Sequence, residues 1–296
     1  MEANILCDSK TEKDIDEFQG NKGEPTRREF AKLSAAAGLG AMLPQVANAM
    51  EVSESDVMVS TPDGQADCYF VHPSSGKHPA AVIWPDILGL RPAFRSMAKR
   101  LAESGYTVLV INPYYRNEKS PVVGLGASFR QEVTKAIVLP LYGTLHAETH
   151  FIDAKAFVAF LDEQDAVDTN RKIGSAGYCM GGPMVMRTAA AVPERIGAIA
   201  SFHGGGLATD DDSPHLLIAK TNASVLHAIA ENDDENDPEA KNTLKAAYAS
   251  ANISAEIEVY AGTLHGWCPP DSVVYNEAQA ERAWARMLAL FKDALV

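Results

Sequence analysis

The chain has 296 residues, of which 46% are hydrophobic and 22% are charged. These proportions are typical of a globular protein with a sizeable core, and they exclude a disordered chain, a collagen-like repeat and a small disulfide-rich scaffold. Lysine and arginine total 26 against 39 aspartates and glutamates, so the formal net charge is −13. Because no stretch is strongly basic, nucleic acids and anionic membrane surfaces are poor partners. At this length we expect one large domain.

The first 49 residues have the three parts of an export signal. Arg27 and Arg28 precede an uncharged, mildly apolar stretch over residues 33–43, and Ala47 and Ala49 provide small residues for cleavage. This order resembles a twin-arginine signal, which predicts recognition by the twin-arginine export machinery and a periplasmic product over residues 50–296. The alternative is a surface helix with a chance arginine pair on a cytoplasmic protein. The apolar stretch is shorter than the ~20 residues that span a bilayer, so we expect no permanent membrane anchor.

After residue 50 the chain alternates strand-like and helix-like stretches. Residues 57–60 and 66–72 flank Thr61-Pro62-Asp63-Gly64, a sequence typical of a hairpin turn. Apolar stretches of strand length then alternate with helical spacing, which predicts an α/β protein with a mostly parallel central sheet flanked by helices on both faces. The expected strands are residues 79–84, 107–111, 172–176, 196–201, 225–230 and 257–260, and the expected helices are residues 94–104, 184–191 and 276–295. Residues 117–147 fit this pattern least and are expected to form a loop or cap.

The sequence Gly177-Tyr178-Cys179-Met180-Gly181-Gly182 stands directly between an expected strand and an expected helix. It fits a nucleophile elbow, a sharp turn that needs small residues two positions on either side of the nucleophile. A side chain at the start of a helix also lies in a positive electrostatic field, which favours a thiolate and a developing oxyanion. Cys179 is therefore the predicted nucleophile. The alternative is a buried structural cysteine in a glycine-rich turn.

A thiolate needs a base, and in proteins with such an elbow the order along the chain is nucleophile, acid, histidine. Asp233 follows the expected strand 225–230, and His265 follows the expected strand 257–260. We therefore predict that Asp233 orients His265, with Asp234 as a close competitor. The acidic stretch that contains both aspartates would otherwise be an ordinary solvated loop. His203 precedes the acid in the chain and is expected only to line the pocket.

The remaining cysteines and histidines do not indicate a metal site. The four cysteines, Cys7, Cys68, Cys179 and Cys268, are far apart and form no C-x-x-C pair. Their spacing predicts no disulfide framework, although one disulfide among the last three stays open. His146 and His150 are spaced as neighbours on a helix, but the sequence suggests no third ligand. We expect no metal and no cofactor.

Several short motifs occur in an order similar to that of the dienelactone hydrolase family. They are Asp86-Ile87-Leu88-Gly89-Leu90, Tyr114-Tyr115-Arg116, the Cys179 elbow, Ser201-Phe202-His203-Gly204-Gly205 and His265-Gly266-Trp267. The resemblance covers residues 55–296, and the elbow with cysteine is its most specific part. It implies an α/β-hydrolase fold and a Cys179-His265-Asp233 triad.

The same resemblance implies further site residues. The backbone N–H groups of Ile87 and Met180 would form the oxyanion hole. Asp86 stands where the family carries a glutamate that contacts the resting thiol, and Arg116 loosely matches an arginine that holds the carboxylate of the substrate. A second family arginine, close after the catalytic histidine, has no counterpart here, because the next residues include only Trp267 and small or apolar side chains. Trp267 is expected to line an apolar pocket.

These features together predict a hydrolase of esters or lactones, of the carboxymethylenebutenolidase type, that forms a thioester with Cys179. Because one of the two arginines is missing, acceptance of dienelactone itself stays open. Two alternatives are a catalytically silent binding protein that keeps the fold, and a thiol-redox protein in which Cys268 approaches Cys179. We expect a monomer or a small homo-oligomer.

Overall fold

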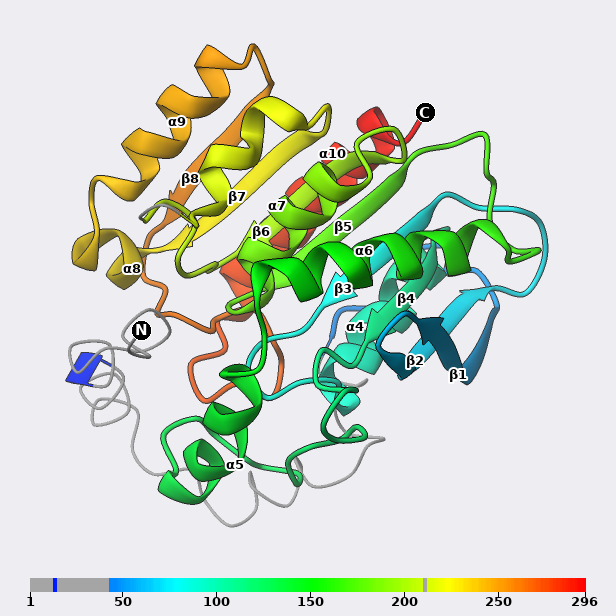
Figure 1. Ribbon diagram of the computed structural model, residues 1–296, viewed down its shortest axis with the longest axis horizontal. Coiled ribbons are helices and arrows are strands. Elements are labelled where there is room, and N and C mark those ends of the chain that lie inside the picture. The colour runs from blue at the N-terminus through cyan, green and yellow to red at the C-terminus, as the bar shows by residue number, and fades with distance from the viewer. Residues whose placement is uncertain (1–12, 15–42, 210–211) are drawn as a thin grey trace.

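A computed structural model describes residues 13–14, 43–209 and 212–296. Most of the predicted export signal, residues 1–49, therefore lies outside the described residues. None of the helices in the described ranges is long and apolar enough to cross a membrane. The rest of the chain forms an eight-stranded sheet in the order β1-β2-β4-β3-β5-β6-β7-β8 (Figure 1).

The sheet begins with the expected hairpin and continues as a parallel sheet. β2 runs antiparallel to both β1 and β4, and every later neighbour pair, from β4-β3 to β7-β8, is parallel. The strands are β1 (Val52–Thr61), β2 (Gly64–Pro73), β3 (Ala80–Trp84), β4 (Thr107–Ile111), β5 (Ile173–Tyr178), β6 (Ile196–Phe202), β7 (Ser224–Ala230) and β8 (Ala255–Tyr260). The predicted fold class is confirmed: this is a mostly parallel sheet between two helical layers.

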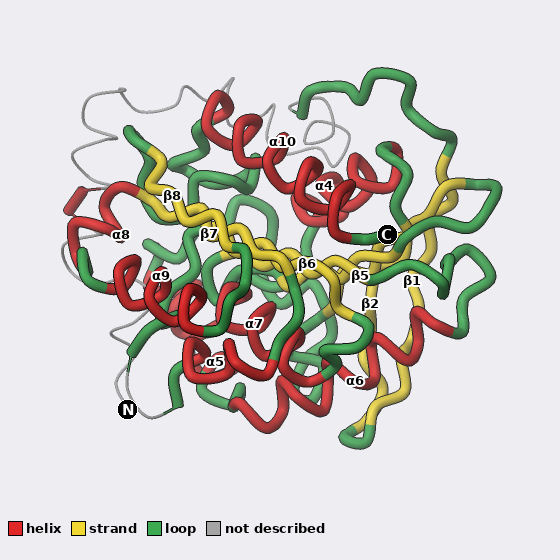
Figure 2. Tube along the Cα trace, turned by 90° about the horizontal axis from the view of Figure 1, so that it is seen from above, coloured by secondary structure: helices red, strands yellow, loops and turns green. Residues whose placement is uncertain are grey.

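Helices cover both faces of the sheet. α4 and α10 lie on one face, and α6, α7 and α9 lie on the other (Figure 2). The helices are α4 (Pro92–Glu103), α5 (Glu132–Tyr142), α6 (Ala147–Asp162), α7 (Gly181–Ala191), α8 (Glu231–Asn236), α9 (Ala240–Ser250) and α10 (Glu277–Ala294), with a 3-10 helix, η1, at Pro214–Lys220. Because both faces are covered, the central strands β3 and β4 are buried at every position and read as continuous apolar stretches.

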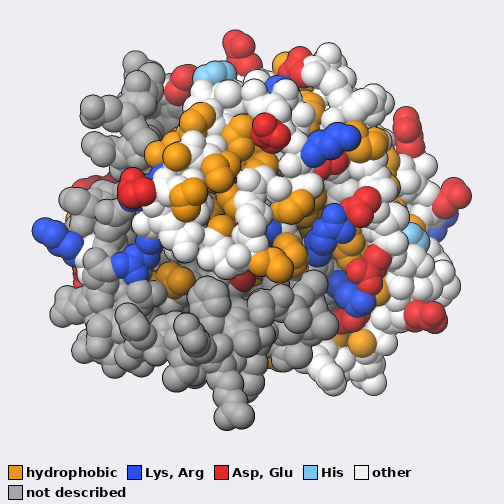
Figure 3. All heavy atoms as spheres, turned by 90° about the horizontal axis from the view of Figure 1, so that it is seen from below, with side chains coloured by type: hydrophobic (Ala, Val, Ile, Leu, Met, Phe, Trp, Pro, Cys, Tyr) orange, Lys and Arg blue, Asp and Glu red, His pale blue; other side chains and the backbone are white. Residues whose placement is uncertain are grey.

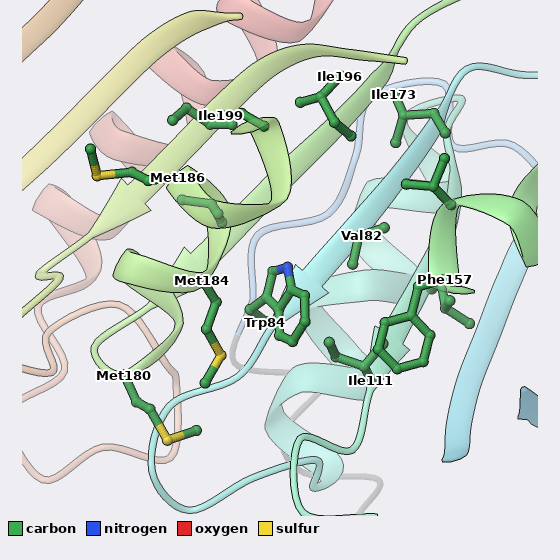
Figure 4. Packing of buried hydrophobic residues seen from close by; sticks show 14 of the residues in the cluster. Val82, Trp84, Ile111, Phe157, Ile173, Met180, Met184, Met186, Ile196 and Ile199 are labelled. Atoms are coloured by element: carbon green, nitrogen blue, oxygen red, sulfur yellow. The ribbon is translucent and has the colours of Figure 1, made fainter. Parts of the chain in front are cut away.

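The alternation of side chains divides the core into two clusters. Val82 and Trp84 of β3 point to the cluster under α6 and α7, whereas Ala81 and Ile83 point to the cluster under α4 and α10. In the first cluster the Trp84 ring meets Phe157 of α6 edge to face, with 5.9 Å between ring centroids (Figure 4). The last residue of β3 is thereby fixed next to the start of α7.

Four α-helices of the described residues, α5, α6, α8 and α9, are not among the helices expected from the sequence. The expected loop or cap over 117–147 contains α5, whose pattern is interrupted by Pro140 near its end. The acidic stretch after β7 forms the short helix α8, and α9 follows it. Their weaker periodicity reflects shallow burial: only Asn232 of α8, and Leu244 and Tyr248 of α9, are buried.

The turn from β5 into α7 brings the backbone at Gly177, Gly181 and Trp84 into close contact. A Cβ on Gly177 would lie 2.1 Å from the carbonyl oxygen of Gly181, and a Cβ on Gly181 would lie 2.3 Å from the carbonyl oxygen of Trp84. Neither backbone oxygen has room to move, since each belongs to a buried segment. Both positions therefore require glycine.

We predict that Gly177→Ala lowers the free energy of unfolding by about 3 kcal/mol or more, because the added methyl group displaces backbone rather than a flexible side chain. Gly124→Ala is the matched control, since a Cβ there meets nothing within 4 Å. Urea denaturation of the two variants measures the difference. Equal stability of the two variants would contradict the proposed close contact.

Candidate active site

Cys179 stands at the apex of this turn. Its φ is +52°, a left-handed conformation that is costly for a side chain other than glycine. The conformation is held by two backbone hydrogen bonds: the Cys179 N–H donates to the Phe202 carbonyl at 3.0 Å, and the Cys179 carbonyl accepts from the Gly182 N–H at 2.9 Å. The side chain is buried at the beginning of α7, at the carboxyl edge of the sheet.

His265 and Asp233 meet at the same edge. The Nδ1 atom of His265 lies 3.0 and 2.9 Å from the two carboxylate oxygens of Asp233. The loop is also held by its backbone, because the His265 N–H donates to the Asn232 side-chain oxygen at 2.8 Å. The structure thus brings Asp233 to His265, whereas Asp234 pairs with Lys241. Of the two aspartates left open by the sequence, Asp233 is the one that contacts His265.

The electrostatics of His265 favour the imidazolium. Burial alone would lower the pKa of His265, but the charges of Asp233 and Cys179 and the hydrogen bond that His265 donates to Asp233 outweigh it and raise that pKa well above its usual value. Since Nδ1 is occupied by Asp233, Nε2 is the nitrogen left for Cys179. Nε2 is buried, and a hydrogen bond between His265 and Cys179 is among the interactions that raise the pKa of His265.

Two backbone N–H groups near Cys179 are free to bind an oxyanion. At the loop after β3, the N–H groups of Leu88 and Gly89 both donate to Asp86, to its side chain and its carbonyl respectively. Neither Ile87 nor Met180 donates its N–H to another group in the part of the chain that the structure describes. These are the two donors implied by the family resemblance, and both belong to segments that border Cys179.

A cavity of about 100 Å³ opens beside Cys179. Its walls come from the loop after β3, the segment before α5, the elbow and the loop after His265. The lining residues are Asp86, Ile87, Leu88, Arg91, Ala127, Ser128, Phe129, Arg130, Cys179, His203, His265, Gly266, Asp271, Ser272, Val273 and Val274. Figure 3 views the molecule from the side of α5 and shows hydrophobic side chains gathered on that face. Leu125, Val133, Ile137 and Val273 are among the exposed large hydrophobic residues.

Asp86 lines the cavity but is bound to an arginine. Arg91 donates to both carboxylate oxygens of Asp86, at 2.6 and 2.9 Å, and to both oxygens of Asp271, at 2.7 and 3.0 Å. The Arg91 side chain is only 7% exposed. One guanidinium group therefore joins the loop after β3 to the loop that follows His265. The Asp86 carboxylate accepts hydrogen bonds from Arg91 and from the Leu88 N–H.

The other predicted substrate-binding residues are placed differently. His203 lines the cavity, and its ring lies 5.1 Å from that of His265. Trp267 is fully buried behind His203 and stacks on Tyr260, so it packs in the core and does not line the cavity. Arg116 is also outside the cavity lining. Its guanidinium pairs with Asp63 and Asp153, which ties the β1-β2 turn to α6.

Sequence reasoning missed Arg91, Asp271 and Asn232. Arg91 had one signal, its place between a strand end and the Pro92 that begins a helix. Asp271 and Asn232 had none, because their partners are 180 and 33 residues away in the chain. The roles of such residues depend on tertiary contacts that no local pattern records.

The cysteines in the described part of the chain form no disulfide. Cys68, Cys179 and Cys268 are all free and buried. Cys268 packs in the cluster under α4 and α10, whereas Cys179 belongs to the cluster on the opposite face of the sheet. The disulfide left open by the sequence is therefore not formed. Within the described ranges, no group of three or more histidine, cysteine, aspartate or glutamate side chains is arranged to hold a metal ion.

Comparison with known proteins identifies the family. A sequence profile of the dienelactone hydrolase family matches residues 66–295. The chain belongs to the dienelactone hydrolase family. A carboxymethylenebutenolidase from Rhodococcus opacus is 26% identical over 236 residues, which cover 76% of this chain and 86% of the relative. The chain is thus a hydrolase of the ester and lactone type.

Solved structures of related proteins share the fold of this chain. A dienelactone hydrolase-like promiscuous phosphotriesterase from metagenomic libraries superimposes with a TM-score of 0.68 at 20% identity, covering 83% of this chain and 99% of the other. A dienelactone hydrolase from Anabaena variabilis gives a TM-score of 0.57 at 17% identity, covering 83% and 99% of the two chains. At these identities the likeness shows the α/β-hydrolase fold alone.

We predict that Arg91→Met destabilises the protein by about 3 kcal/mol, because it leaves the Asp86 and Asp271 carboxylates partly buried without a counter-charge. The matched control is Arg286→Met, which breaks the Arg286–Glu256 pair on the surface, where the arginine side chain is 50% exposed. Such a screened pair contributes little. Thermal and urea unfolding measure the stability of the two variants. An equal loss of unfolding free energy in both would show that the Arg91 ion pairs contribute no more than a surface pair.

We predict that Asp233→Asn moves the alkaline limb of kcat/KM to lower pH. The Asp233 carboxylate raises the pKa of His265, so its removal lets the imidazolium lose its proton at a lower pH. The rate at the optimum should also fall by about 10²–10⁴, as expected when a triad histidine loses its orienting carboxylate. Asp234→Asn is the matched control. An unchanged alkaline limb in Asp233→Asn would show that deprotonation of His265 does not produce that limb.

Proposed function

We propose that the chain hydrolyses small carboxylic esters and lactones with Cys179 as the nucleophile, through a thioester intermediate. The observation that carries this proposal is the position of Cys179. It is held at a positive φ on a strand-to-helix turn, it borders the cavity, and it lies next to a histidine paired with a carboxylate. This is the arrangement of an activated nucleophile with its base and an orienting acid.

The reaction follows from these positions. The proton of the Cys179 thiol is already held by His265 as the imidazolium. The Cys179 sulfur adds to the substrate carbonyl carbon, and the carbonyl electron pair moves onto oxygen, where the N–H groups of Ile87 and Met180 stabilise it. Collapse of this intermediate breaks the ester bond, and His265 gives its proton to the leaving oxygen. His265 then takes a proton from water, and the hydroxide attacks the thioester carbon. The C–S bond breaks, the carboxylic acid leaves, and the Cys179 sulfur is regenerated beside the protonated His265.

The cavity favours substrates of low net charge. Its lining includes two carboxylates, Asp86 and Asp271, and two arginines, Arg91 and Arg130, and Arg91 is already paired with both carboxylates. Leu88, Phe129 and other apolar side chains form much of the remaining wall. The Cys179 thiolate is itself a good leaving group. The intermediate therefore goes on to the thioester only when the departing oxygen forms an anion at least as stable as that thiolate. Enol lactones and aryl esters meet this condition better than alkyl esters or peptides.

We predict that Cys179→Ala abolishes turnover of p-nitrophenyl acetate, lowering kcat at least about 10³-fold, because no other group replaces the nucleophile. Cys68→Ala is the matched control, since Cys68 is a buried free thiol outside the cavity. Acyl-enzyme formation is checked by intact-mass spectrometry, with the acylated residue mapped after proteolysis. Turnover that survives Cys179→Ala in folded protein would exclude the thiol mechanism, and the relative rate on dienelactone would define the preference for charged substrates.

A further inference from the structure

The two N–H groups of the oxyanion hole belong to different parts of the chain. Ile87 is on the loop after β3. Met180, labelled in Figure 4, follows the nucleophile at the start of α7. Donors of this kind act only when both point at one small region of space, and a displacement near 1 Å costs up to about 10²-fold in rate. A structural element must therefore hold the two segments in register.

Tyr114 connects these two segments. It follows β4, it is fully buried, and its hydroxyl donates to the Ile87 carbonyl at 2.8 Å while lying 3.3 Å from the sulfur of Met180. Its own backbone is fixed, because the Tyr114 N–H donates to the side-chain oxygen of Asn112 at 3.0 Å. Burial raises the pKa of Tyr114 well above its usual value, so the hydroxyl keeps the proton that it donates.

The Tyr114 contact completes the restraint on Ile87. The Ile87 N–H shares a planar peptide group with the Asp86 carbonyl, and that carbonyl is fixed by the Gly89 N–H at 2.9 Å. Tyr114 fixes the next peptide group through the Ile87 carbonyl. The Tyr114 ring also packs against Gly89, where an added Cβ would lie 3.4 Å from the ring. Both peptide groups that flank Ile87 are thus held, and one of them is tied to Met180.

We propose that Tyr114 is a positioning residue for the oxyanion hole: its hydroxyl, shared between the Ile87 carbonyl and the Met180 sulfur, holds the two N–H donors in register. This proposal rests on the proposed function, since it assumes a tetrahedral oxyanion at Cys179. Tyr114 does not touch the substrate. It acts through the geometry of Ile87 and Met180.

The test is Tyr114→Phe, which keeps the ring and removes only the hydroxyl. We expect kcat for p-nitrophenyl acetate to fall between about 10- and 100-fold with KM changed less than about twofold. An aryl trifluoromethyl ketone reports on the hole directly, because the Cys179 sulfur adds to its carbonyl and leaves an oxyanion there. Its affinity should fall by the same factor as kcat/KM. Alkylation of Cys179 by iodoacetamide forms no oxyanion, so its rate should not change.

Tyr248→Phe is the matched control. It removes another buried tyrosine hydroxyl, which lies 2.9 Å from the His227 ring, away from the cavity. It should leave kcat and ketone affinity unchanged, so a purely structural effect of losing a buried hydrogen bond is measured separately. If Tyr114→Phe does not fold, Met180→Leu tests the same contact by removing the sulfur while keeping the backbone N–H, and it should weaken ketone binding without slowing alkylation.

Two outcomes would overturn the proposal for Tyr114 alone. In the first, Tyr114→Phe binds the ketone as tightly as the wild-type protein and keeps its kcat. In the second, alkylation slows in parallel with turnover, which would place the effect at the thiol and not at the oxyanion hole. If wild-type protein forms no adduct with the ketone and hydrolyses no ester, the proposed function itself fails and the role of Tyr114 falls with it.

Discussion

The site depends on backbone contacts between β3, β5 and α7. Gly181 approaches the last carbonyl of β3 so closely that no side chain fits, and Gly177 approaches Gly181 in the same way. This contact forces the chain to turn at Cys179 with a positive φ, and it places the loop after β3 beside the nucleophile. The strain at Cys179 is offset by the packing of a sheet that is buried on both faces. One close approach therefore fixes both Cys179 and the loop after β3, which supply the nucleophile and an oxyanion donor in the proposed function.

The loops at the carboxyl edge are then joined by polar contacts from outside the cavity. Asn232 and Asp233 of α8 hold the backbone and ring of His265, and Arg91 joins Asp86 to Asp271. These contacts are buried or half-buried, where the local dielectric is low and unpaired partners are costly. The loops that carry His265 and Asp86 are in this way held by contacts from outside the cavity. In the proposed mechanism, such preorganisation would let the N–H and imidazole groups act without rearranging during the reaction.

The sequence predicted the parts of this structure that arise from local patterns. The continuous apolar stretches indicated the parallel strands, and the glycine spacing around Cys179 indicated the turn, because both patterns follow from burial and steric limits. The chain order of acid and histidine indicated Asp233 and His265 but did not separate Asp233 from Asp234. That choice depends on the direction of side chains from α8, where Asp234 meets Lys241. Arg91 contacts Asp271 and Tyr114 contacts Met180, partners that are distant in the chain, so only the fold shows these contacts.

The placement of the arginines shows why a motif position does not by itself define specificity. Arg116 stands at a position similar to that of a substrate-binding arginine, yet its charge is taken up by Asp63 and Asp153, away from the cavity. Arg91 does reach the cavity, but two carboxylates occupy its donors. A guanidinium paired in this way offers little attraction to a further anion, because a substrate carboxylate would have to compete with Asp86 and Asp271 at close range. Under the proposed thiol mechanism, selection among substrates would depend on their fit to the apolar wall of the cavity and on the stability of the leaving oxygen, which together favour small esters and enol lactones.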